Sequence, residues 1–197
     1  MSQPDVDALS VGVLALQGDF AAHAKVLDAM GVRWREVRTP DGLAHVCGLI
    51  LPGGESTTML KLLTEEGFIE PLHMLLERGG AFFGTCAGAI LLAKQVEHPA
   101  QPSLGFVDIV VERNAYGRQV NSFIDWTMSS ALGPPPLELV FIRAPIIRHV
   151  GAGVEVLAEH QGHPVLVRQG RCLVATFHPE LTEDRRVHQL FLQMLSA

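Results

Sequence analysis

The chain has 197 residues, which is enough for one sizeable hydrophobic core. Hydrophobic residues make up 48% of the chain and charged residues 18%, and this balance excludes general disorder. The 15 basic residues form no basic block and are outnumbered by 21 acidic ones, for a formal net charge of -6. We therefore expect no nucleic-acid-binding surface.

The first ten residues, MSQPDVDALS, carry acidic groups and lack the apolar centre of a signal peptide. No later apolar run approaches the roughly 20 residues that a membrane helix needs. We therefore expect residues 1–10 to be an N-terminal extension, and the protein to be cytoplasmic and to bind no membrane. The cysteines, Cys47, Cys86 and Cys172, are odd in number and contain no close pair, which argues against a disulfide framework or a four-thiolate zinc site.

In the first half of the chain, short apolar runs alternate with stretches of helical period. Strands are predicted at residues 11–16, 34–37, 49–51 and 81–83. Helices are predicted at residues 19–30 and 69–77, with a third beginning at Ser56 or Thr57, either of which is a good N-cap. A fourth helix is predicted to follow the strand at residues 81–83 and to continue through Lys94. This alternation is typical of a parallel sheet covered by helices on both faces.

After residue 104 the pattern becomes rich in strands. They are predicted at residues 106–111, 139–142, 154–158, 165–167 and 173–177, with a loop at 134–136. A last helix is predicted at residues 182–195, with Glu183 and Asp184 in its first turn, where the helix dipole favours acidic groups. We expect one α/β domain over residues 11–197: a three-layer open sheet with a mostly parallel core and additional, partly antiparallel strands.

The segment Gly84-Thr85-Cys86-Ala87-Gly88 lies between a predicted buried strand and a predicted helix. This is the setting of a nucleophile elbow with cysteine in place of serine. Small residues permit the sharp turn, and a thiol at a helix start is favoured in its thiolate form. The amide of Ala87 could donate to an oxyanion. The structural alternative is a buried cysteine in an ordinary turn.

A cysteine nucleophile needs an oriented histidine, and His178 is the best candidate among nine. It ends a predicted strand and precedes Pro179, which favours an extended conformation. Residues two apart in an extended segment point the same way, so Glu180 would accept a hydrogen bond from His178. We therefore expect a triad of Cys86, His178 and Glu180. The alternative is a surface turn before the last helix.

The segment 51–57, LPGGEST, follows another buried strand at the edge where open α/β sheets bind ligands. Its two glycines expose amides that could stabilise developing negative charge. Phosphate binding is disfavoured because no Gly-Lys-Ser/Thr follows the glycines. A turn capped by Ser56 is the remaining structural alternative.

Other polar residues give weaker signals. Arg113 and Arg143 each end a strand-like run, where they could hold a substrate carboxylate or be solvated charges. His160 and His163 lack a visible third ligand, so no metal site is predicted. Cys47 and Cys172 are interpreted as core residues.

Taken together, six segments resemble class I (triad) glutamine amidotransferases, and most closely the family of glutaminase subunits that serve pyridoxal 5'-phosphate synthase. GTCAG at 84–88 and FHPELTED at 177–184 are shared by many amidotransferases. The segments specific to the vitamin B6 branch are LPGGESTTM at 51–59, VVERNAYGRQV at 110–120 and FIRAP at 141–145, and Leu-Gln-Gly at 16–18 also matches. The resemblance implies a flavodoxin-like class I glutamine amidotransferase fold.

The resemblance also implies site roles. Cys86 would attack the side-chain amide of L-glutamine, with His178 as acid and base and Glu180 orienting it. Gly54 and Ala87 would supply the oxyanion amides. The residues implied to surround glutamine are Gly54, Glu55, Ser56, Arg113, Ile142 and Arg143.

The implied partner is a synthase subunit of the PdxS or SNZ type, which takes up the ammonia, with Gln17 near the contact between the subunits. No cofactor is implied. Two alternatives remain. One is the glutaminase of imidazole glycerol phosphate synthase, which the VVERN and FIRAP segments disfavour. The other is a non-catalytic binding module, in which His178 and Glu180 would have no role.

Overall fold

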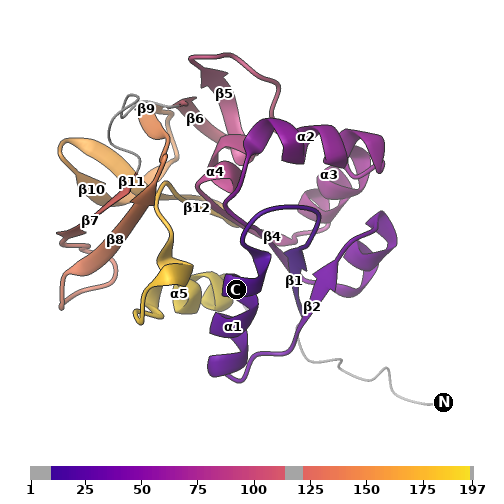
Figure 1. The fold of residues 1–197 in the computed structure, drawn as a ribbon, viewed down its shortest axis with the longest axis horizontal. Coiled ribbons are helices and arrows are strands. Elements are labelled where there is room, and N and C mark those ends of the chain that lie inside the picture. The colour runs from indigo at the N-terminus through magenta and orange to yellow at the C-terminus, as the bar shows by residue number, and fades with distance from the viewer. Residues whose placement is uncertain (1–9, 114–121, 196–197) are drawn as a thin grey trace.

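A computed structural model describes residues 10–113 and 122–195 and shows a central sheet between two layers of helices (Figure 1). In spatial order, its seven strands are β10 (Glu155–His160), β11 (His163–Gln169), β12 (Cys172–Ala175), β4 (Ala81–Thr85), β3 (Gly48–Leu51), β1 (Val11–Leu14) and β2 (Trp34–Val37). The strands from β12 to β2 are parallel, and β11 and β10 continue the sheet antiparallel. The predicted three-layer α/β architecture is confirmed.

The helices divide between the two faces of this sheet. One face carries α1 (Phe20–Ala29) and α5 (Arg186–Leu195), and the other carries α2 (Ser56–Glu65), α3 (Ile69–Glu77) and α4 (Ala87–Leu92) (Figure 1). Two short 3₁₀ helices, η1 (Pro40–His45) and η2 (Pro179–Leu181), complete the helical elements of the described residues.

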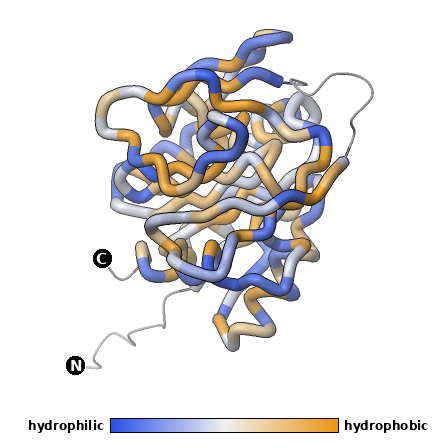
Figure 2. Tube along the Cα trace, turned by 90° about the vertical axis from the view of Figure 1, so that its left-hand side faces the viewer, coloured by the Kyte–Doolittle hydropathy of each residue, from blue (hydrophilic) through white to orange (hydrophobic). Residues whose placement is uncertain are grey.

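The core consists of two hydrophobic clusters, because successive side chains of a strand point to opposite faces. In β4, Phe82 packs in the cluster that contains Leu72 of α3, whereas Phe83 packs in the one that contains Phe191 of α5. Figure 2 shows hydrophobic stretches running through the middle of the molecule. A strand buried on both faces explains the continuous apolar runs of the sequence.

Two smaller sheets lie outside the central one. The first contains β5 (Ala93–Glu97), β6 (Val107–Glu112) and β9 (Ile146–Val150), and the second contains β7 (Ser122–Thr127) and β8 (Leu137–Ile142). The sequence did not predict β5, β7 or β9. The prediction of a helix through Lys94 was wrong: α4 ends at Leu92, because Ala93 adopts an extended conformation with φ -62° and ψ 151°.

The predicted start of α2 at Ser56 is confirmed, but its predicted N-cap and the predicted start of the last helix need correction. The N-cap of α2 is Glu55, neither Ser56 nor Thr57, and its carboxylate accepts the amides of Thr57 and Thr58. The last helix begins at Arg186, so Glu183 and Asp184 precede it. The reason is that η2 is followed by an extended residue, Thr182, which delays the helix.

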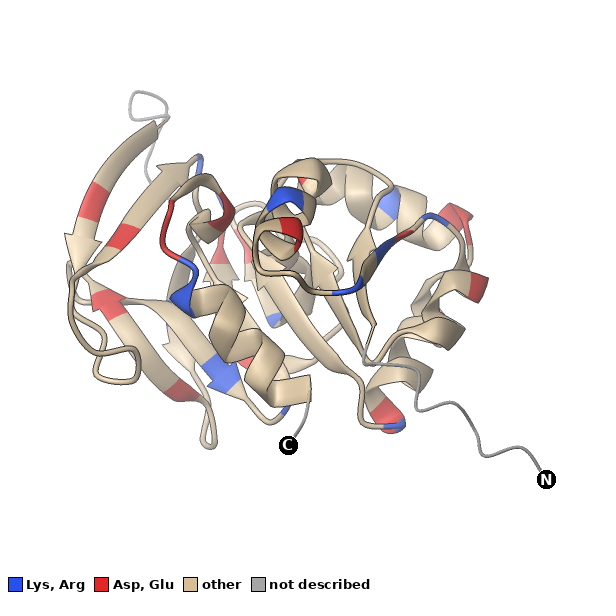
Figure 3. Cartoon of the chain, turned by 90° about the horizontal axis from the view of Figure 1, so that it is seen from below, with Lys and Arg blue, Asp and Glu red and all other residues tan. Residues whose placement is uncertain are grey.

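The charged residues are dispersed over the fold. Figure 3 shows short basic and acidic segments separated by uncharged chain on the face that carries α5. Among the described residues, no helix combines the length and apolarity needed to cross a membrane.

Candidate active site

Cys86 occupies a strained turn between β4 and α4. Its φ of 48° and ψ of -98° lie in a backbone region that residues other than glycine rarely adopt. Gly88 makes the turn sterically feasible, because a Cβ at this position would lie 2.1 Å from the carbonyl oxygen of Leu51. The predicted strand–elbow–helix arrangement is therefore present.

The backbone on the neighbouring strands fixes the Cys86 sulfur. The Cys86 amide donates to the carbonyl of Ala175, the last residue of β12, at 2.9 Å. The thiol lies 3.7 Å from the carbonyl oxygen of Ile142, to which it donates, and the residue is 6% exposed. Ala87 is the first residue of α4, so its amide has no acceptor within the helix.

His178 and Glu180 lie at the same edge of the sheet, just after β12. His178 Nδ1 and Glu180 Oε1 are 2.7 Å apart, and both residues are buried. The backbone amide of His178 donates to Val140 of β8 at 2.8 Å, which fixes the residue in place. The spacing of two residues therefore produces the expected histidine–carboxylate pair.

The charge states of this pair follow from its surroundings. Burial disfavours the imidazolium, but the side chains of Cys86 and Glu180 more than offset this and raise the pKa of His178 to about 10. Burial likewise disfavours the Glu180 carboxylate, but His23 and His178 outweigh it and lower the pKa of Glu180. His178 Nε2 is buried and has no hydrogen-bond partner of regular geometry in the described part of the chain. The Cys86 side chain is nevertheless close enough to raise the pKa of the imidazole.

The loop after β3 packs directly against the His178 ring. A Cβ on Gly53 would lie 2.4 Å from His178 Cε1, so the ring rests on bare backbone. Gly54 has a φ of 155°, and a Cβ there would lie 2.6 Å from Gln17 Oε1. Gln17 accepts the amide of Glu55 at 3.1 Å. Gln17, predicted at a partner contact, thus braces the loop that carries the predicted oxyanion residue Gly54.

Glu55 and Arg113 are brought together at the start of α2. Arg113 Nη2 lies 3.3 Å from Glu55 Oε1 and 3.1 Å from Thr57 Oγ1. Ser56 is buried, and its hydroxyl donates to Gln101 Oε1 at 3.0 Å. The Ser56 side chain is therefore engaged within the protein.

Ile142 and Arg143 lie at the end of β8, and both are exposed. The Ile142 carbonyl faces the Cys86 sulfur, as described above, and Arg143 has a φ of 48°. The remainder of the VVERNAYGRQV segment, residues 114–120, lies outside the described residues.

Residues that the sequence did not single out also surround the triad. His23 of α1 lies 3.5 Å from Glu180 Oε1, and its ring contacts His188 of α5 and Thr85 of β4. The available signal was the position of His23 four residues before Leu27, on the buried face of the predicted helix. Gly53, next to the predicted Gly54, was also missed as a ring contact.

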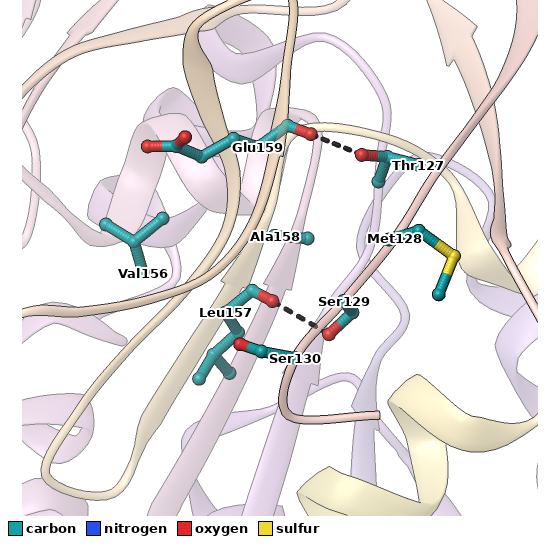
Figure 4. Close-up of a pocket in the computed structure, with 8 residues that line it drawn as sticks. All are labelled: Thr127, Met128, Ser129, Ser130, Val156, Leu157, Ala158 and Glu159. Atoms are coloured by element: carbon teal, nitrogen blue, oxygen red, sulfur yellow. Dashed lines mark hydrogen bonds between the residues drawn. The ribbon is translucent and has the colours of Figure 1, made fainter. Parts of the chain in front are cut away.

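A cavity of about 580 Å³ between β7 and β10 contains none of the predicted site residues. Figure 4 shows that two of its hydroxyl groups are already used: Thr127 donates to the carbonyl of Glu159 at 2.5 Å, and Ser129 to that of Leu157 at 2.7 Å. His160, at the end of β10, is buried against Phe141. Across residues 10–113 and 122–195, no group of three His, Cys, Asp or Glu residues could hold a metal ion.

Comparison with known proteins places this chain in a family. Residues 13–197 match the model of the SNO glutamine amidotransferase family. The pyridoxal 5'-phosphate synthase subunit PdxT of Koribacter versatilis is 57% identical over 187 residues, covering 95% of this chain and 96% of that protein. The corresponding subunit of Thermotoga neapolitana is 49% identical over 187 residues, covering 95% and 100%.

A solved structure agrees with these sequence matches. The structure named "Crystal structure of glutamine amidotransferase" is 51% identical, covers 95% of this chain and 99% of its own, and superposes with a TM-score of 0.89. The resemblance read from the motifs is confirmed, and the chain belongs to the SNO glutamine amidotransferase family.

Proposed function

We propose that this chain is the glutaminase subunit of a pyridoxal 5'-phosphate synthase and hydrolyses L-glutamine to L-glutamate and ammonia through Cys86. The observation that carries the proposal is the convergence of an elbow cysteine with a buried histidine–carboxylate pair at one edge of the sheet. The names of the relatives in Koribacter versatilis and Thermotoga neapolitana support the choice of synthase.

The reaction follows from the roles of the three side chains. The Cys86 sulfur attacks the amide carbon of glutamine while His178 Nε2, as imidazolium, holds the proton that the thiol has given up. The tetrahedral oxyanion is stabilised by the amides of Gly54 and Ala87. When the C–N bond breaks, His178 returns the proton to nitrogen, and ammonia leaves. Water then attacks the thioester with His178 as base, which releases glutamate and restores the thiol.

The rest of the site would hold the substrate. Arg113 or Arg143 would pair with the glutamine carboxylate, since guanidinium groups bind carboxylates in a forked geometry. Glu55, Ser56 and Ile142 complete the proposed glutamine-binding set. Glu180 would keep the His178 ring aimed at the sulfur throughout.

The ammonia would pass to a synthase subunit bound at the active-site edge, near Gln17. Free ammonia is mostly protonated near neutral pH and then is no nucleophile, so a closed passage between the subunits would preserve its reactivity. We take residues 11–197 to be the amidotransferase domain. A cytoplasmic location fits a mechanism that needs a reduced thiol, and all three cysteines are free.

The test measures ammonia release and pyridoxal 5'-phosphate formation after mixing with a cognate synthase subunit. Cys86→Ala should abolish glutamine-dependent formation of both products while leaving formation from added ammonia salts intact. Cys47→Ala is the matched control, because Cys47 lies beside Ser10, away from the triad, and burial raises the pKa of its thiol. Unchanged ammonia release by Cys86→Ala would contradict the nucleophile assignment. Support of imidazole glycerol phosphate formation instead would contradict the choice of synthase.

A further inference from the structure

Two buried histidines from different helices meet next to the proposed triad. His23 of α1 and His188 of α5 are both 0% exposed, and His23 Nδ1 lies 3.0 Å from His188 Nε2. The opposite ring nitrogen, His23 Nε2, lies 3.1 Å from Thr85 Oγ1 and 3.5 Å from Glu180 Oε1. One imidazole thus contacts both the residue before the nucleophile and the carboxylate that orients His178.

The proton positions on these rings follow from their neighbours. Glu180 Oε1 already accepts from His178 Nδ1 and carries negative charge, so a bare nitrogen lone pair on His23 Nε2 would be repelled by it. A proton on His23 Nε2 instead faces two oxygen acceptors. His23 Nδ1 is then the acceptor and His188 Nε2 the donor, which leaves His188 Nδ1 as a buried nitrogen without a partner. The opposite assignment would leave a buried N–H unpaired, and buried unpaired donors are rare.

Both rings are neutral at physiological pH. Burial lowers the pKa of His23. The negative charges of Glu180 and Asp19 oppose this shift, and the positive charge of His178 reinforces it. Burial and the neighbouring His23 lower the pKa of His188 to about 3, with Glu180 opposing and Arg185 reinforcing the shift. A neutral His23 can donate its Nε2–H to Thr85 and turn the positive end of the same N–H dipole toward Glu180, without competing with His178 for the role of cation.

We propose that His23 is a positioning residue, whose Nε2–H ties the Glu180 carboxylate to Thr85 and thereby fixes the imidazole of His178 relative to the Cys86 elbow. The proposal rests on the proposed function, because it assigns His23 to the same triad. Phe83 restricts the ring further, since it meets His23 edge-on at 5.9 Å and His188 at 5.4 Å between ring centroids.

Two amide substitutions separate the two faces of the His23 ring. In His23→Gln, the side-chain amide nitrogen can occupy the place of Nε2 and donate to Glu180 and Thr85. In His23→Asn, the side-chain oxygen can occupy the place of Nδ1 and accept from His188 Nε2, and no donor is left to face Glu180 and Thr85. Both variants bury one neutral amide in the same site, so their costs in folding are closely matched.

The assay measures the kinetics of glutamine hydrolysis with the synthase subunit present. A hydrogen bond to a charged group changes equilibria by roughly 10- to 100-fold, so kcat of His23→Asn should fall by about that factor while KM stays within about twofold. His23→Gln should keep kcat within about threefold, and the pH profile of its kcat/KM should match that of the wild type. Equal activity of the two variants, or retention by Asn and loss by Gln, would overturn the proposal. A changed pH profile in His23→Gln would overturn the neutral-donor role.

A measurement on the unaltered protein makes the test independent of folding in the variants. In ¹⁵N-histidine-labelled wild type, the His23 shifts should report a protonated Nε2 and a bare Nδ1 between pH 6 and 8. A protonated Nδ1 would overturn the proposal. Cys86→Ala distinguishes the two levels of inference: hydrolysis by that variant refutes the proposed function, whereas loss of hydrolysis with full activity of His23→Asn refutes only the role of His23.

Discussion

Substituting Gly53 by alanine should displace the proposed catalytic base, His178, although the substitution leaves all three triad residues unchanged in sequence. The new Cβ would lie 2.4 Å from His178 Cε1 and 3.0 Å from Nδ1. The loop cannot retreat, because the Gly53 carbonyl accepts the Asp19 amide at 3.0 Å and a Cβ on Gly18 would lie 2.0 Å from the same oxygen. The imidazole must therefore give way.

The size of the displacement sets the size of the effect. An ordinary van der Waals contact begins at 3.4 Å, so the ring has to move by about 1 Å. The hydrogen bond from His178 Nδ1 to Glu180 Oε1 is 2.7 Å long, and a shift of that size is enough to break it. Misplacing a reacting group by about 1 Å costs roughly 100-fold in rate, so kcat should fall by about that factor.

The assay is glutamine hydrolysis by the complex with the synthase subunit, together with thermal unfolding. Gly42→Ala is the matched control. Gly42 lies in η1, and a Cβ there would lie 3.3 Å from the side chain of Val37 in β2, with no triad residue among its nearest contacts. We expect Gly53→Ala to remain folded and Gly42→Ala to keep wild-type kcat. If Gly53→Ala retained kcat within about threefold, the claim that backbone at this glycine positions the imidazole would be refuted.

Three further changes test stability. Gly88→Ala places a Cβ 2.1 Å from the Leu51 carbonyl oxygen, a backbone atom that cannot rotate away, so the free energy of unfolding in urea should fall by about 3 kcal/mol. A variant as stable as wild type would contradict the close packing of the elbow. The groups around His178 outweigh its burial and raise its pKa from 6.5 to about 10, so its stabilising contribution is complete below pH 6.5 and is lost as pH rises through about 10. The difference in unfolding free energy between wild type and His178→Asn should shrink over that range, and a constant difference would count against the raised pKa. Glu55→Ala removes the cap of α2 and should cost about 1 kcal/mol near neutral pH. The α2 amides lower the pKa of Glu55 below 4.5 despite its partial burial, so that cost should be complete above pH 4.5 and should be lost as the pH falls through the lowered pKa. A cost that stays constant throughout the acid titration would disprove the charged cap.

The inner strands of the central sheet, β1, β3, β4 and β12, were predictable because they are buried on both faces. Trp34–Val37 and Ile69–Glu77 have the predicted bounds, since glycines or polar residues interrupt the hydrophobic pattern on each side. The outer strands β5, β7 and β9 were not predictable. In β7, Ile124 and Trp126 are 53% and 59% exposed, so the strand presents apolar residues outward and lacks the usual apolar-in, polar-out alternation.

At the site, the sequence predicted the histidine–carboxylate pair, because the relation between His178 and Glu180 is local: their contact depends on two residues of extended chain. It did not predict the contacts of His23. Its partners Thr85 and His188 are 62 and 165 residues away in sequence, and only the packing of α1 and α5 on the same face brings them together. A buried histidine on an apolar helix face reads as an ordinary core residue until that packing is known.

The hydrogen bond from the Cys86 amide to the Ala175 carbonyl has a consequence for how the chain tolerates change. Thr85 and Ala175 are paired residues of adjacent parallel strands, and this pairing brings Cys86 and the segment that leads to His178 to the same edge of the sheet. From the excursion between α4 and β11, β8 adds backbone contacts to both residues, through the carbonyls of Val140 and Ile142, but the excursion takes no part in the pairing of β4 with β12. Loops of the excursion that lie outside these contacts, such as the one at residues 134–136, are therefore free to lengthen or shorten while the β4–β12 pairing keeps this edge of the sheet unchanged.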